Sequence, residues 1–126
     1  MLNGSCVCGG VRFELRTAPT GATACHCVQC RKQSGHFFAS ANVAKDAVKL
    51  LASGTLRWYR SSPKVRRGFC SFCGSWLFWE PVERDWTSVA LGAIDGATGL
   101  HLERHIFVAE KGDYYDLADG LPQDEH

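Results

Sequence analysis

The chain has 126 residues, of which 45% are hydrophobic and 21% are charged, close to the averages for a globular domain. Its formal net charge of +1 is far from the basic balance of a nucleic-acid-binding domain, so we expect no nucleic-acid partner. No apolar run approaches the roughly 18 residues that span a membrane, and we expect no signal peptide before the first cysteines. We therefore expect a single cytoplasmic domain over residues 1–126, with no membrane partner.

Short stretches of alternating apolar and polar residues, separated by turn residues, predict an all-β domain. The first clear example is the run in which Val11, Phe13 and Leu15 alternate with charged residues. Further strands are predicted at residues 37–41, 48–51, 55–60, 65–69, 76–79, 86–91 and 105–108.

Helix signals are weak along the whole chain. We expect only short helical turns, at residues 28–34 and 45–48, and a non-regular turn at residues 17–21. The polar residues 119–126 are expected to form a frayed C-terminal end.

All seven cysteines fall in three tight clusters, with two thiols in each outer cluster and three in the middle one: Cys6 and Cys8; Cys25, Cys27 and Cys30; Cys70 and Cys73. In a reducing compartment such clusters bind metal more often than they form disulfides. A structural zinc site uses four protein ligands, whereas a catalytic site uses three and keeps one position open. One site of each kind would use all seven thiols.

The two outer clusters are each expected to bend sharply around a metal ion. Cysteines two residues apart on a flat strand are about 6–7 Å apart at Cα, whereas zinc-bound sulfurs are about 3.8 Å apart. Gly9 and Gly10 after the first pair, and Gly74 after the last, provide the backbone freedom for these bends. The two pairs together resemble the halves of a zinc ribbon, with iron as the chemical alternative to zinc.

The middle cluster places three thiols within six residues, which suits one ion rather than two. His26 lies between two of these cysteines, so its ring is expected to point away from the metal. His36 is a candidate either as a closing fourth ligand or as a substrate-binding residue. Without such a ligand the site stays open for water or a substrate thiol.

Two groups of cations lie close to cysteines in the sequence. Arg31 and Lys32 follow the middle cluster directly and are candidate substrate-binding residues, able to hold a carboxylate; the alternative is a solvated pair. Lys64, Arg66 and Arg67 precede the last cluster and are expected to form a solvated face, with an anionic ligand site as the alternative.

The order of these motifs resembles the glutathione-dependent formaldehyde-activating enzyme family, also called the GFA or centromere-protein-V domain. The resemblance covers nearly the whole chain through the segments 4–11, 25–35, 69–74, 105–108 and 118–122. It implies a small β-tent fold related to zinc ribbons, with two Zn²⁺ ions per chain. By the same resemblance the structural zinc is held by Cys6, Cys8, Cys70 and Cys73, and the catalytic zinc by Cys25, Cys27 and Cys30.

The activity implied by the resemblance is that of a zinc-dependent carbon–sulfur lyase, similar to an S-(hydroxymethyl)glutathione synthase. Its substrate would be a thiol adduct, formed from glutathione and formaldehyde or a related small molecule. Three thiolates leave a zinc site with a charge of about −1, which suits a soft thiolate better than hydroxide. The alternatives are a carrier of glutathione or aldehyde and a non-catalytic zinc-binding module, although a simple zinc ribbon needs only four of the cysteines.

Overall fold

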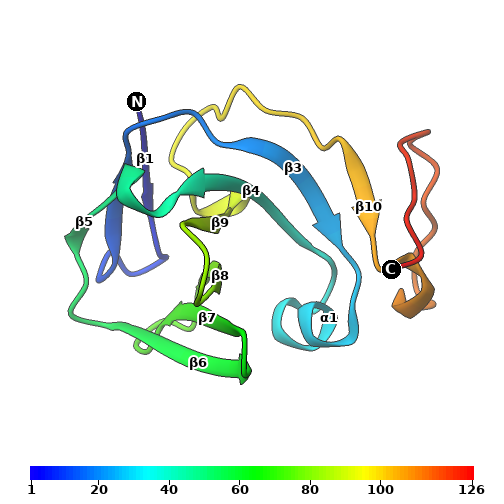
Figure 1. Ribbon diagram of the computed structural model, residues 1–126, viewed down its shortest axis with the longest axis horizontal. Helices are drawn as coiled ribbons and strands as arrows, with labels where there is room; N and C mark the ends of the chain where they lie inside the picture. Colours follow the sequence, from blue (N-terminus) through cyan, green and yellow to red (C-terminus); the bar gives the residue numbers. More distant parts are fainter.

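The computed structural model describes residues 1–126, which form two β-sheets and a few short helical turns (Figure 1). The smaller sheet has the order β1-β2-β5, formed by β1 (Leu2–Ser5), β2 (Arg12–Leu15) and β5 (Val48–Ala52). The larger sheet has the order β10-β3-β4-β9-β8-β7-β6. Its strands are β3 (Thr20–Cys25), β4 (Phe38–Ala44), β6 (Leu56–Ser62), β7 (Val65–Cys70), β8 (Trp76–Pro81), β9 (Trp86–Ala90) and β10 (Arg104–Ile106). The predicted all-β class is confirmed.

The helical segments are short and lie at the ends of strands. They are α1 (Val28–Ser34) and the 3-10 turns η1 (Lys45–Ala47), η2 (Leu91–Ala93) and η3 (Val108–Glu110). The helical turns predicted at residues 28–34 and 45–48 correspond to α1 and η1. None of these helices has the length and apolar character needed to cross a bilayer.

The main core lies between the two sheets. In β2 the alternation places Phe13 and Leu15 inward, where both are fully buried. Phe13 packs against Phe78 of β8, with ring centroids 5.2 Å apart. Gly4 of β1 lies directly opposite Phe13, and a Cβ at this glycine would lie only 2.1 Å from the ring. The glycine is therefore required for the close approach of β1.

Two strands, β1 and β3, are absent from the sequence prediction. The turn expected at residues 17–21 ends early, because β3 already begins at Thr20. Ala22 and Ala24 are the fully buried residues of β3, and alternating small residues give almost no hydrophobic signal. This omission matters because β3 carries Cys25 at its end.

The C-terminal segment, expected to be frayed, is instead hydrogen-bonded to β10 and the turn after it (Figure 1). The His105 amide donates to the Pro122 carbonyl at 2.9 Å, and the Asp124 amide donates to the His105 carbonyl at 2.8 Å. An ion pair of 2.9 Å between Arg104 and Asp124 adds to this attachment. The segment covers the otherwise open edge of β10. Backbone pairing of this kind cannot be predicted from amino-acid composition.

Candidate metal centres

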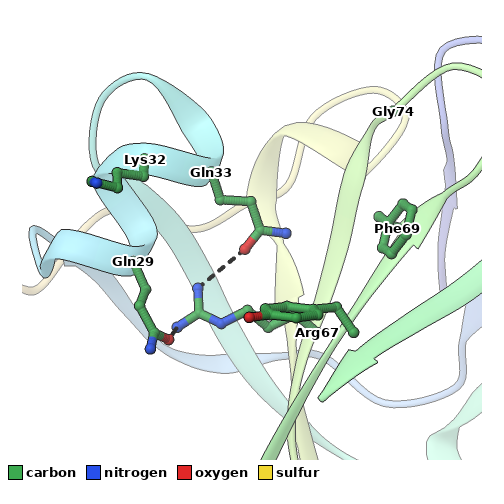
Figure 2. A pocket seen from close by; sticks show the side chains of 7 residues that line it. Gln29, Lys32, Gln33, Arg67, Phe69 and Gly74 are labelled. Atoms are coloured by element: carbon green, nitrogen blue, oxygen red, sulfur yellow. Dashed lines mark hydrogen bonds between the residues drawn. The ribbon is translucent and has the colours of Figure 1, made fainter. Parts of the chain in front are cut away.

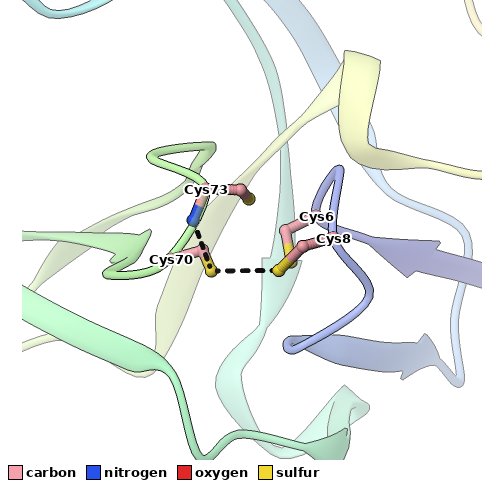
Figure 3. A group of neighbouring side chains, drawn as sticks. All are labelled: Cys6, Cys8, Cys70 and Cys73. Carbon is pink, nitrogen blue, oxygen red and sulfur yellow. Dashed lines mark hydrogen bonds between the residues drawn. The ribbon is translucent and has the colours of Figure 1, made fainter.

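Four cysteines from two distant parts of the chain meet at one point (Figure 3). Cys6 and Cys8 lie in the turn between β1 and β2, Cys70 ends β7, and Cys73 lies in the turn that follows. Their sulfur atoms all lie within 4.8 Å of one another, with Cys6–Cys8 at 3.6 Å and Cys8–Cys70 at 3.7 Å. These distances match the roughly 3.8 Å between sulfurs of a tetrahedral zinc site. This four-cysteine group therefore fits a single metal ion.

The backbone around the four-cysteine group is bent as the sequence predicts. Gly9 and Gly74 adopt φ values of 78° and 81°, a region that favours glycine. The bends turn backbone amides toward the sulfurs at 3.2–3.4 Å, from Val11 to Cys6, from Gly10 to Cys8 and from Cys73 to Cys70. Such donors favour the thiolate form that a metal requires.

The other three cysteines form a separate group around the start of α1. Cys25 ends β3, Cys27 is the N-cap of α1, and Cys30 is buried in its first turn. The Cys27 sulfur accepts a hydrogen bond from the Cys30 amide at 3.3 Å, so the helix geometry itself brings these two residues together. The three sulfurs lie within 4.8 Å of one another, and no histidine or carboxylate belongs to this three-cysteine group.

The electrostatics of the three-cysteine group favour a cation. Contacts from Cys25 and Cys30 hold the pKa of Cys27 well below its usual range, while the same contacts raise the pKa values of Cys25 and Cys30. Crowding therefore disfavours the ionisation of all three sulfurs in the absence of a cation. A divalent ion would compensate all three, and thiolates are ligands that soft metals prefer, so the donor set fits the metal that the sequence predicts.

His26 is fully buried and uses both ring nitrogens away from the sulfurs. Its Nδ1 is hydrogen-bonded to the Tyr115 hydroxyl, and its Nε2 is hydrogen-bonded to His105 Nδ1 at 2.9 Å. His105 Nε2 then donates to the Asp119 carboxylate at 2.7 Å. Burial and the neighbouring His105 lower the pKa of His26 to about 4, so this ring stays neutral at pH 7. This network joins the C-terminal segment to the loop that carries the three-cysteine group.

A cavity of about 710 Å³ opens beside the three-cysteine group, within the range of small-molecule sites. Its walls include all three cysteines and the side chains of Phe38, Trp79, Trp86, Ser40, Asn42 and Ser88. Only two charged residues line it, Arg67 and Glu110. One oxygen of Glu110 accepts a hydrogen bond of 3.0 Å from the Val28 amide at the start of α1. We call this space the cysteine cavity.

The three residues proposed from the sequence to bind substrate lie near the cysteine cavity but do not line it. Lys32 lines a neighbouring cavity of about 530 Å³ on α1 (Figure 2). His36 is exposed and packs edge-on against Tyr115, with ring centroids 4.2 Å apart. Arg31 is partly buried in α1. Substrate binding by Arg31, Lys32 and His36 stays a prediction.

Arg67 differs from the expectation of a solvated face, since only 4% of it is exposed. Its neighbour Arg66 points to the other side of β7, where it pairs with Glu80 at 2.5 Å and lies 3.9 Å over the Trp58 ring. Adjacent strand residues face opposite ways, so two consecutive arginines in a predicted strand already require one to face inward. Strand alternation thus predicts that one of the two arginines faces inward, and the structure shows that it is Arg67.

The sequence and fold were compared with known proteins. The family model described as glutathione-dependent formaldehyde-activating enzyme matches residues 1–110. A protein of Halomonas elongata, named as a candidate glutathione-dependent formaldehyde-activating enzyme, is 30% identical over 93% of this chain and 81% of its own length. The crystal structure of a Rhodobacter sphaeroides protein has the same fold, with a TM-score of 0.63 at 22% identity over 77% of this chain and 91% of that one. The chain therefore belongs to the glutathione-dependent formaldehyde-activating enzyme family.

Proposed function

We propose that this chain catalyses the reversible addition of a thiol, glutathione, to formaldehyde or a related small aldehyde. The observation that carries the proposal is the three-cysteine group, which has no fourth protein ligand and lines a cavity of about 710 Å³. The family description and the name of the Halomonas elongata relative support glutathione and formaldehyde as the substrates. In the reverse direction the reaction is that of a carbon–sulfur lyase.

We assign one zinc ion to each cysteine group, within a single domain of residues 1–126. The four-cysteine group would hold a structural zinc, because its ligands come from both ends of the core. A zinc ion in the three-cysteine group would supply a soft Lewis acid that favours the ionised form of a thiol. A free thiol with pKa about 8.5 is only about 3% ionised at pH 7, so complete ionisation is a gain of about 30-fold.

In the proposed reaction, the thiolate sulfur attacks the carbonyl carbon and forms the carbon–sulfur bond. The electron pair of the carbonyl π bond moves to the oxygen, which takes up the proton that the thiol released. Glu110 is the only carboxylate that lines the cysteine cavity, so we assign it the transfer of this proton. Its bond to the Val28 amide at 3.0 Å fixes the carboxylate at the start of α1.

The remaining walls of the cysteine cavity suit a polar organic thiol. Trp79 and Trp86 provide apolar surface that limits the access of water, with ring centroids 5.9 Å apart. Ser40, Asn42 and Ser88 provide hydroxyl and amide groups for hydrogen bonds to a peptide-like ligand. Side chains of the strands β4, β8 and β9 would therefore orient the thiol.

Hemithioacetal formation from glutathione and formaldehyde tests the proposal. We expect a rate above the uncatalysed reaction with the metal-loaded protein, and loss of that increase after chelation. Binding of glutathione without any increase in rate would identify a carrier instead. A protein that neither binds glutathione nor accelerates the reaction would be a non-catalytic metal-binding module.

A further inference from the structure

Arg67 is a buried cation that has no acidic partner. Its guanidinium donates to two neutral amides of α1, at 2.8 Å to Gln29 Oε1 and at 3.2 Å to Gln33 Oε1 (Figure 2). It also lies 4.9 Å over the ring of Trp76, while its buried Nε–H has no acceptor in the protein. Burial of a charge without a counter-charge is costly, so the fold predicts that an anion completes this site.

The candidate anion is the three-cysteine group. One terminal nitrogen of Arg67 donates to the Cys30 sulfur at 3.8 Å, within the range of a hydrogen bond to sulfur. Glu110, the carboxylate of the same cavity, instead accepts a hydrogen bond from the Val28 amide. The Cys30 sulfur is therefore the potential anion that Arg67 contacts directly.

The balance of charges then explains why the three-cysteine group would accept a negatively charged thiolate as its fourth ligand. Three thiolates around a divalent ion carry a total charge of −1, and Arg67 brings the site to zero. A fourth thiolate returns the site to −1, whereas without Arg67 the total would reach −2. Because this environment is buried, each added charge matters more than it would in water.

We propose that Arg67 is the counter-cation of the three-cysteine group, a positioning residue that makes an anionic sulfur ligand favourable there. The inference rests on the proposed function, because it requires a metal in this group and a thiol as its ligand. Gln29 and Gln33 of α1 hold the planar guanidinium, and the same helix carries Cys30. The positive charge and the sulfur ligand are therefore held by one element.

The test uses protein loaded with Co²⁺ and titrated separately with glutathione and with 2-mercaptoethanol. The protein's own cysteines already give a thiolate-to-cobalt absorption band, so the increase of this band on addition of thiol reports binding of each thiol. In Arg67→Gln we expect the apparent affinity for both thiols to fall about tenfold, the effect of one charge-assisted hydrogen bond. Arg84→Gln removes an exposed arginine from the turn after β8 and should leave both titrations unchanged.

The two thiols separate the counter-cation from a simple carboxylate-binding residue. A loss that affects glutathione alone, and spares the uncharged 2-mercaptoethanol, would overturn the proposal and assign Arg67 to a substrate carboxylate. Equal affinity in Arg67→Gln and the wild type would also overturn it, while leaving the proposed function intact. No increase of the thiolate-to-cobalt band when either thiol is added to the wild type would remove both the proposed function and this inference.

A second variant keeps the test valid if Arg67→Gln does not fold. Gln33→Glu places a carboxylate beside the guanidinium at an exposed position, so it gives Arg67 a permanent partner without removing it. We expect this variant to fold and to bind both thiols about tenfold more weakly, because the positive charge is already neutralised. Unchanged affinity for both thiols in Gln33→Glu would contradict the proposal.

Discussion

Both cysteine groups offer sulfur ligands, but one group links distant segments of the chain and the other is local. The four-cysteine group joins segments far apart in sequence, with Cys8 and Cys70 separated by 62 residues. The three-cysteine group lies within six residues, from the end of β3 into the first turn of α1. A metal in the first group would close a large part of the fold, whereas a metal in the second would organise only one local turn.

Their surroundings differ in the same sense. The four-cysteine group lies between two turns whose backbone amides donate to sulfur. The three-cysteine group faces a cavity with one buried cation, Arg67, and one carboxylate, Glu110. The two groups therefore differ in more than the number of ligands. The three-cysteine group also has space beside it for a ligand and charged side chains that could position one.

The largest expected effect is on folding, through the four-cysteine group. Cys73→Ser should abolish cooperative folding, since structural zinc contributes about 10–16 kcal/mol in zinc-finger peptides and whole domains are stable by about 5–15 kcal/mol. Soluble yield and thermal melting followed by circular dichroism measure the effect. A variant that melts at the wild-type temperature would show that this group is not structural.

The matching change in the three-cysteine group should remove function and spare the fold. Cys27→Ser deletes one proposed metal ligand, but serine is a favourable N-cap, so α1 should still form. We expect a melting temperature close to that of the wild type and a rate of adduct formation at the uncatalysed level. Equal loss of stability in Cys73→Ser and Cys27→Ser would remove the contrast between the two groups.

A smaller effect is expected from the carboxylate of the cysteine cavity. Glu110→Gln keeps an oxygen for the Val28 amide but cannot exchange a proton, so kcat should fall about 100-fold. Steady-state rates with glutathione and formaldehyde provide the measurement, with little change expected in thiol binding. Glu83→Gln, in the exposed turn between β8 and β9, is the control; an unchanged kcat in Glu110→Gln would exclude the proposed proton transfer.

The smallest effect concerns the turn that shapes the four-cysteine group. Gly74→Ala forces alanine into a φ of 81°, which should reduce the free energy of unfolding by about 1 kcal/mol. Gly54→Ala is the matched control, because a Cβ there meets no atom within 4 Å and no positive φ is required. Chemical denaturation of the metal-loaded proteins measures both; equal stability would show that this bend is not strained.

The sequence predicts the class of fold and the three cysteine clusters because both depend on local patterns, and the count of four plus three ligands predicts that the two outer clusters meet. Spacings of two and three residues restrict how sulfurs can meet, and the structure brings together the same four and the same three. Strands with strong alternation, such as the run containing Phe13 and Leu15, were also predicted. The short helix was found because it follows the middle cysteines directly.

The missed features depend on pairing and packing rather than on composition. The strand β3 is built on small residues such as Ala22 and Ala24, and the C-terminal segment is held by backbone bonds. Arg67 was assigned to a solvated run because arginine is rarely buried. Only the tertiary structure shows that α1 provides two amides and a sulfur around its guanidinium.

Metal content during graded chelation tests the contrast between the two groups most directly. Elemental analysis of protein purified without added metal should approach two ions per chain, with one removed first by a mild chelator. Alkylation followed by mass spectrometry should then locate the first exposed thiols at Cys25, Cys27 and Cys30, while the four-cysteine group stays protected. A single tightly held ion with freely alkylated middle thiols, or simultaneous loss of both ions, would contradict the account.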